Sequence, residues 1–216
     1  MVNILEREVS ILNQFIAEIR DIEIQKNSLR FRRNLERIGE IFALEISKTL
    51  DYKESNIQTP LGISNSKIIS DDIVLAVILR AGLPFHNGFL NYFDKADSSF
   101  ITAYRKYRKD ETFDIKIEYI SSTDLNDKIL IICDPMLATG ASMIMAYNAL
   151  LEYGTPKHTH IASIISSDES IEYLKKKLIG PNNTIWTGAV DNELTVKSYI
   201  VPGLGDAGDL AYGKKL

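Results

Sequence analysis

A run of apolar residues that ends in a carboxylate and continues into small residues is the most informative feature for chemistry. Residues 129–133 are apolar, Asp134 follows them, and Ala138, Thr139, Gly140, Ala141 and Ser142 form a small-residue segment. If a helix opens at Ser142, free backbone N–H groups and the helix dipole converge on one point, which suits a phosphate. Asp134 can then reach sugar hydroxyls or a hydrated Mg²⁺. An ordinary strand-to-helix turn with Ser142 as N-cap explains the same residues equally well.

A second candidate for anion binding is Arg80, which follows the apolar run 73–79 and precedes Ala81 and Gly82. An arginine at the carboxyl end of a strand, beside a glycine turn, can hold a diphosphate through paired charge-assisted hydrogen bonds. Taken alone, an ordinary surface arginine is the more common explanation.

The C-terminal segment 199–209 is rich in glycine, and four of the chain's 12 glycines lie in its last 14 residues. Such a density either frees a tail or lets backbone groups approach a flat ligand closely. Gly203, Gly205 and Gly208 spell a dinucleotide fingerprint, but too little chain follows for its helix. Residues 208–215 imitate a P-loop, yet Lys215 stands where a serine or threonine is needed.

Residues 104–109 carry four cations, and after them the apolar residues of 113–119 recur at every second position. This alternation predicts a hairpin strand outside the parallel core, and therefore a flap over about residues 104–121. In one interpretation Arg105 closes over a diphosphate and excludes water. A solvated hairpin and a small RNA-binding patch are the alternatives.

The histidines and the single cysteine are weaker candidates. His86, His158 and His160 lack the spacing of a metal site, and His158 and His160 are expected to face water at a strand edge. Cys133 falls within an apolar run and is interpreted as a small buried hydrophobic residue.

The elements that must position these residues alternate along the chain. Apolar residues at three- and four-residue steps predict a helix over 28–50, with Asn27 or Ser28 as N-cap, and 51–70 suits a small hairpin or arm. Strands are predicted at 73–79, 129–133, 161–165 and 185–190, with helices at 84–93, 142–153 and 169–178 between them. Unbroken apolar runs of this kind are typical of strands covered on both faces, so the fold class is α/β with a parallel sheet.

Length and composition predict one domain, 1–216, with N-terminal helices over 1–50 and a core over about 71–190. A net charge of −4 argues against a dedicated DNA-binding protein. A single cysteine and the lack of an uninterrupted apolar leader predict a cytoplasmic protein. The longest apolar run has seven residues, far short of the ~20 that cross a bilayer.

The three segments Ile78–Gly82, Asp134–Ser142 and Tyr199–Asp209 together resemble the type I phosphoribosyltransferases, and in detail the uracil phosphoribosyltransferase family. Asp-Pro-Met-Leu-Ala-Thr-Gly, with Pro135 in place of a second acid, is that family's version of the phosphoribosyl-diphosphate loop. Residues 199–209 are similar to its uracil-binding loop almost letter for letter. The resemblance implies a hood formed by the flap and this loop, and a transfer of phosphoribosyl from phosphoribosyl diphosphate to uracil that yields UMP.

The same resemblance implies a role for each matched residue. Backbone groups from Ala138 to Ser142 would hold the 5′-phosphate, Asp134 the ribose hydroxyls, and Arg80, Arg105 and Mg²⁺ the diphosphate. Asp206 would lie by the reacting centre and hold Mg²⁺ or the diphosphate through water. The backbone around Ile200, Gly205 and Ala207 would bind uracil and reject cytosine. Asp134, Arg105 and Asp206 are therefore the expected catalytic residues.

Some positions depart from the family pattern: Asn87 replaces an acid, 194–198 differ before the uracil loop, and Leu210 replaces a basic residue. Family members are often dimers or larger oligomers, and some are activated by GTP, so a homo-oligomer is expected and GTP is a candidate effector. An RNA-binding pyrimidine regulator of the same fold and a catalytically silent homologue remain as alternatives.

Overall fold

The computed structural model describes residues 1–107 and 113–215, and for 104–107 and 113–116 the backbone alone. A central sheet has the strand order β1-β10-β9-β7-β4-β5-β6, and β8 (Met136–Leu137) also pairs with β9. The bounds of its other strands are β1 Val2–Ile4, β4 Ile73–Leu79, β5 Asp97–Tyr107, β6 Phe113–Ser121, β7 Ile129–Cys133, β9 His158–Ser167 and β10 Asn183–Asp191. Its pairings are parallel except for β5 with β6, so the predicted α/β class with a parallel core is confirmed.

The central strands are buried on both faces because successive side chains point into two separate cores. In β7, Ile129, Ile131 and Cys133 join one core, whereas Leu130 and Ile132 join the other. The strand β4 divides in the same way. This alternation explains why the sequence shows unbroken apolar runs here.

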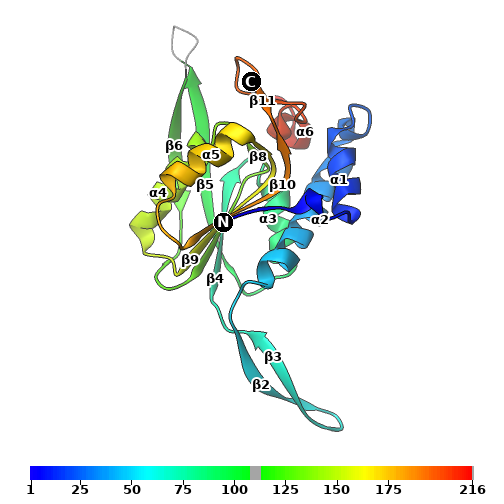
Figure 1. Cartoon of the computed structure of the whole chain (residues 1–216), viewed down its shortest axis with the longest axis vertical. Coiled ribbons are helices and arrows are strands. Elements are labelled where there is room, and N and C mark those ends of the chain that lie inside the picture. The colour runs from blue at the N-terminus through cyan, green and yellow to red at the C-terminus, as the bar shows by residue number, and fades with distance from the viewer. Residues whose placement is uncertain (108–112, 216) are drawn as a thin grey trace.

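Helices cover both faces of the sheet (Figure 1). One face carries α1 (Ile11–Arg20), α2 (Ser28–Ser47) and α3 (Leu83–Leu90), and the other carries α4 (Ala141–Leu150) and α5 (Asp168–Lys177). The helix α2 begins as predicted, since the Asn27 side chain accepts a hydrogen bond from the Arg30 N–H. Short 3-10 turns lie at Leu5–Arg7 (η1), Ile24–Lys26 (η2) and Leu151–Tyr153 (η3).

Two hairpins extend from the sheet at opposite ends (Figure 1). The hairpin of β2 (Tyr52–Thr59) and β3 (Gly62–Ile69) forms the arm that the sequence predicts. At its base Lys157 pairs with Asp51 at 2.7 Å and with Asp71 at 2.5 Å. The hairpin of β5 and β6 lies at the same end as the C-terminal segment, which contains β11 (Glu193–Leu194), β12 (Ile200–Val201) and α6 (Ala207–Tyr212).

Several expectations about individual segments are wrong. The N-terminal 50 residues are not helices alone, because β1 pairs with the edge strand β10. The start of β5 was not predicted: residues 97–102 pair in parallel with β4, whereas the described flap residues after them pair only antiparallel within the hairpin, as expected. The helix α4 begins at Ala141 rather than Ser142, and its N-cap is Gly140, with no side-chain cap.

The prediction that His158 and His160 face water at a strand edge is also wrong for His160, whereas His158 is half-buried beside Thr184. The strand β9 lies inside the sheet, and His160 is buried and accepts a hydrogen bond at Nδ1 from the Trp186 indole at 3.0 Å. Burial lowers the pKa of His160 to about 3, so this imidazole is neutral. The thiol of Cys133 is buried, as expected.

Within the described ranges, no helix is both long and apolar enough to cross a bilayer.

Candidate active site

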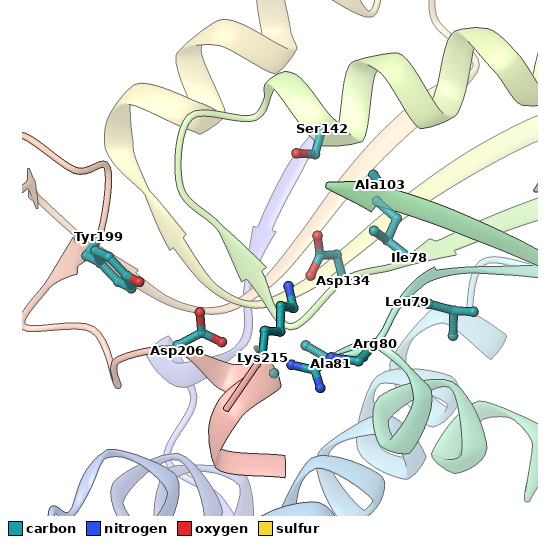
Figure 2. A pocket seen from close by; sticks show the side chains of 11 residues that line it. Ile78, Leu79, Arg80, Ala81, Ala103, Asp134, Ser142, Tyr199, Asp206 and Lys215 are labelled. Carbon is teal, nitrogen blue, oxygen red and sulfur yellow. The ribbon is translucent and has the colours of Figure 1, made fainter. Parts of the chain in front are cut away.

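The carboxyl ends of β4 and β7 and the C-terminal segment surround one cavity of about 430 Å³ (Figure 2). This is where open α/β sheets bind ligands, because loops at the carboxyl edge converge there. The volume is within the range of small-molecule sites. Its lining residues are Ile78, Leu79, Arg80, Ala81, Ala103, Asp134, Ser142, Tyr199, Asp206, Gly208 and Lys215.

The loop after β7 encloses a smaller cavity of about 50 Å³, lined by Asp134, Met136–Gly140, Ser142 and Met143. Gly140 has φ +78°, which favours glycine, and a Cβ there would lie 2.5 Å from Leu174 Cδ1, so the leucine side chain would have to shift. The loop is held from behind, since Ser167 Oγ donates to the Ala138 carbonyl at 2.5 Å. This small cavity thus lies beside the first residues of α4, whose free N–H groups can bind a phosphate.

Asp134 lies between these two cavities and lines both. Burial raises the pKa of its carboxyl group to about 7, and a hydrogen bond from the Met136 N–H opposes this shift. Both its protonated and its ionised form are therefore accessible near neutral pH.

Arg80 follows β4 directly, after a cis peptide bond to Leu79. Its Nη2 donates to Asp209 Oδ1 at 3.2 Å, and its Nη1 to the Gly213 carbonyl at 3.4 Å. Its Nε is buried without a hydrogen-bond partner. The guanidinium is thus oriented from the C-terminal segment and keeps further N–H donors for a ligand.

The C-terminal loop forms a third cavity of about 160 Å³ with the start of the β7 loop. Its lining residues are Ala81, Met136, Ala138, Ser198–Ile200 and Gly205–Gly208. Ile200, Leu204 and Ala207 belong to the hydrophobic core, so the loop is packed and is not a free tail. Asp206 caps α6 by accepting from the Asp209 N–H at 2.9 Å, and a Cβ on Gly208 would lie 3.2 Å from its Oδ1.

The three cavities adjoin one another, because each pair of them shares lining residues. They bring together most of the residues singled out in the sequence: Arg80, Asp134, Ala138, Thr139, Gly140, Ser142, Ile200, Gly205, Asp206 and Ala207. Ala141 is the first residue of α4, beside this group. The backbone of Arg105 lies on β5 opposite Ile115, but its side chain, like Glu111 and Thr112, is outside the described part.

The sequence pattern of the uracil phosphoribosyltransferase family matches residues 8–214. The chain belongs to the uracil phosphoribosyltransferase family. Among curated relatives, a uracil phosphoribosyltransferase of Porphyromonas gingivalis is 57% identical and covers 98% of both chains. One of Methanothermobacter thermautotrophicus is 42% identical over 85% of this chain and 84% of its own.

The family assignment agrees with the fold found in solved structures. A protein of Aquifex aeolicus has a TM-score of 0.87 at 29% identity, over 99% of this chain and 98% of its own. The orotate phosphoribosyltransferase of Mycobacterium tuberculosis, in complex with inorganic phosphate, has a TM-score of 0.50 at 10% identity, over 86% and 91% of the two chains. The fold is that of the type I phosphoribosyltransferases.

Four residues that sequence reasoning did not assign also belong to this uracil phosphoribosyltransferase site. Asp209 pairs with Arg80, Met136 lines the cavity beside the C-terminal loop, and Tyr199 and Lys215 line the central one. The sequence pattern around Lys215 only resembles a P-loop and assigns no role to this residue. The fold alone brings Lys215 to the same cavity as Arg80. Tyr199 and Asp209 are the first and last residues of the glycine-rich segment, so the glycine density of that segment was the signal that could have identified them.

The described residues suit a metal ion that binds together with the substrate. No three histidine, cysteine or acidic side chains within them gather as a metal-binding group. The central cavity nevertheless contains two carboxylates, Asp134 and Asp206 (Figure 2). Mg²⁺ is commonly held by one or two carboxylates together with substrate phosphates and water, which is the arrangement that this cavity can accept.

Proposed function

We infer that this protein is a uracil phosphoribosyltransferase, which converts uracil and phosphoribosyl diphosphate into UMP and diphosphate. The observation that carries this inference is the set of three adjoining cavities. One is narrow and faces the start of a helix, one is central and contains charged side chains of both signs, and one has an apolar floor beside a packed loop. They match the 5′-phosphate, the ribose with its diphosphate, and the base.

The reaction breaks the bond between C1 of the ribose and a diphosphate oxygen, and forms a bond from C1 to N1 of uracil. Positive charge develops on the ribose ring and negative charge on the leaving diphosphate. Catalysis therefore needs alignment and charge stabilisation more than a nucleophilic side chain. The charged residues of the central cavity, which come from three separate segments, support this proposal because they can surround the reacting groups from several sides.

The phosphoribosyl group is proposed to lie across the β7 loop. The N–H groups from Ala138 to Ser142 bind the 5′-phosphate, and Asp134 accepts hydrogen bonds from the ribose hydroxyls. When Asp134 is ionised, its negative charge also favours the positive charge that develops on the ring.

Arg80 and Lys215 are the described cations of the central cavity that are proposed to bind the diphosphate. The free Nε of Arg80 supports this role, because a buried donor without a partner favours binding of an oxygen ligand. Arg105 remains the predicted third cation. Mg²⁺ bound with the diphosphate would neutralise part of its charge, and Asp206 is placed to contact its water shell.

Uracil is proposed to bind between Met136 and the backbone of the loop around Ile200, Gly205 and Ala207. A fixed N–H facing O4 of uracil would meet the amino group of cytosine donor to donor. A buried unpaired donor costs about 1–3 kcal/mol, and this energy difference excludes cytosine.

The test is formation of UMP from uracil and phosphoribosyl diphosphate with Mg²⁺, beside parallel reactions with cytosine, hypoxanthine and orotate. Turnover with uracil alone is expected. Binding of UMP without turnover of any base would contradict the inference. Assembly into a homodimer or larger oligomer, activation by GTP and a cytoplasmic location remain predictions, which sedimentation, kinetic assays with GTP and cell fractionation can test.

A further inference from the structure

An ion pair between Arg20 and Asp191 lies behind the base-binding loop. Arg20 Nη1 is 2.7 Å from Asp191 Oδ2, and Arg20 Nη2 is 2.9 Å from Asp191 Oδ1. The two side chains are largely buried, with 21% and 8% of their surfaces exposed. Two parallel hydrogen bonds of this kind fix the orientation of both groups as well as their distance.

The pair binds both backbone polar groups of one loop residue. The Gly203 N–H donates to Asp191 Oδ2 at 2.9 Å, and the Gly203 carbonyl accepts from Arg20 Nη1 at 3.0 Å. Gly203 has φ +54°, and a Cβ there would lie 2.1 Å from the Ile200 carbonyl. It therefore occupies a tight turn between Ile200 and Gly205, which both line the base cavity.

A second contact holds the next loop residue from the same side. In the amide orientation that satisfies its neighbours, the Gln25 nitrogen donates to the Leu204 carbonyl at 2.9 Å and to the Ile19 carbonyl at 3.3 Å. The C-terminal end of α1 and the following turn thus hold residues 203 and 204, while Asp191 ends β10. These segments connect the loop to the sheet from behind and do not line the cavity.

A second ion pair that involves α1 is also joined by two hydrogen bonds, but it lacks this connection to the loop. Arg30 donates to both oxygens of Glu18 at 2.8 and 2.9 Å, and Asn34 donates to one of them at 2.7 Å. Glu18 belongs to α1, Arg30 and Asn34 belong to α2, and none of the three belongs to the C-terminal loop. If ion pairs on α1 served stability alone, loss of either pair would affect the enzyme in the same way.

We propose that Arg20 and Asp191 are positioning residues for base recognition: they fix the Gly203 turn, and through it the backbone donors and acceptors that bind uracil. This rests on the proposed function. The loop reads the base through its backbone, so a displacement of the turn moves the recognising atoms themselves. The 5′-phosphate pocket lies on another loop, held by Ser167, and is independent of this pair.

The experiment compares Arg20→Ala and Asp191→Asn with Arg30→Ala and Glu18→Gln in steady-state kinetics. We expect the KM for uracil to rise about tenfold or more in the first two variants, and that for phosphoribosyl diphosphate to change less than about threefold. Both constants should stay within about twofold of the wild-type values in the Arg30 and Glu18 variants. Equal effects of the two pairs, or an unchanged KM for uracil in a folded Arg20 variant, would overturn the proposal.

Amide hydrogen exchange separates this proposal from the assigned reaction. Exchange of the Gly203 amide should quicken in Arg20→Ala and stay at the wild-type rate in Arg30→Ala, whichever base the wild-type enzyme uses. If the wild-type protein fails to use uracil but this difference is seen, the reaction is wrong and the positioning role stands. Should Asp191→Asn not fold, Arg20→Lys keeps the charge without the paired geometry, and an intermediate KM for uracil is expected. If Arg20→Lys kept the wild-type KM for uracil, the paired hydrogen bonds of Arg20 would not be what positions the turn.

Discussion

The ionisation of Asp134 couples the chemistry of the site to pH. Its pKa of about 7 lies above the 3.8 of an unperturbed aspartate, so the folded chain holds a proton that the unfolded chain releases. The free energy of unfolding therefore falls as the pH rises from about 4 to about 7. Asp134→Asn removes this loss, so its melting temperature should exceed that of the wild type at pH 8 and match it at pH 4. A melting temperature that is lower at pH 8 would contradict burial as the cause.

The same residue predicts a kinetic pH dependence. Because the carboxylate form is the one proposed to accept hydrogen bonds from the ribose, kcat/KM for phosphoribosyl diphosphate should decline as the pH falls below about 7. Asp134→Asn should lower kcat/KM by at least about a hundredfold and remove this decline. A decline that persists in the variant would assign the ionisation to another group.

Lys215 and Lys214 offer a matched pair at the C-terminus. Lys215 lines the central cavity, and its exposed neighbour Lys214 does not. We expect Lys215→Ala to raise the KM for phosphoribosyl diphosphate about fivefold, which is the effect of one solvent-exposed ionic contact. Lys214→Ala should leave this KM unchanged. Equal effects would show that only the net positive charge matters.

At the scale of elements, the turn before α4 depends on Gly140. Gly140→Ala should cost about 1–3 kcal/mol of stability through its positive φ and should raise the KM for phosphoribosyl diphosphate, because the Cβ collides with Leu174. Gly180→Ala is the control, since Gly180 also has a positive φ, +114°, but open space around it. Urea denaturation should show a loss of stability in both variants, whereas kinetics should show a raised KM for phosphoribosyl diphosphate in Gly140→Ala alone. A normal KM in Gly140→Ala would mean that the loop adapts.

Sequence patterns predicted best the elements whose residues are all buried among apolar side chains. Ile73–Leu79 and Ile129–Cys133 were predicted with their exact bounds, because all residues of these two buried strands are apolar. The start of β5 was missed because it is polar: Ser99 is fully buried and satisfied by Ser122 at 2.8 Å. His160 was misplaced for the same reason, since its partner Trp186 is 26 residues away and only the fold brings them together.

At the scale of the whole molecule, the site joins segments that lie far apart in the chain, from Ile78 to Lys215. The family resemblance identified the loops, but the contacts that orient them, such as Arg80 with Asp209 and Arg20 with Gly203, join residues more than 125 positions apart. Such pairs have no local signature in the sequence, since each partner is a common residue type whose neighbours in the sequence look like those of a surface residue.

A ligand that bridges these segments should stabilise the whole chain. At a concentration 100 times its Kd, UMP is expected to add about 2.7 kcal/mol to the free energy of unfolding. For a chain of this length that corresponds to a rise of roughly 5–10 °C in melting temperature. CMP at the same concentration should raise it much less, because its amino group would face the N–H that is proposed to bind O4 of uracil. Equal shifts for UMP and CMP in thermal denaturation would contradict recognition of the base.

The burial of Cys133 leaves the surface of this protein inert toward thiol reagents. Cys133 is the chain's one cysteine, and burial raises the pKa of its thiol well above the usual value, so the nucleophilic thiolate is scarce. A cysteine introduced at Leu61, which is wholly exposed at the tip of the β2–β3 arm, would therefore be the single site of maleimide attachment. A fluorophore placed there reports on the surroundings of the arm without a background from the native protein.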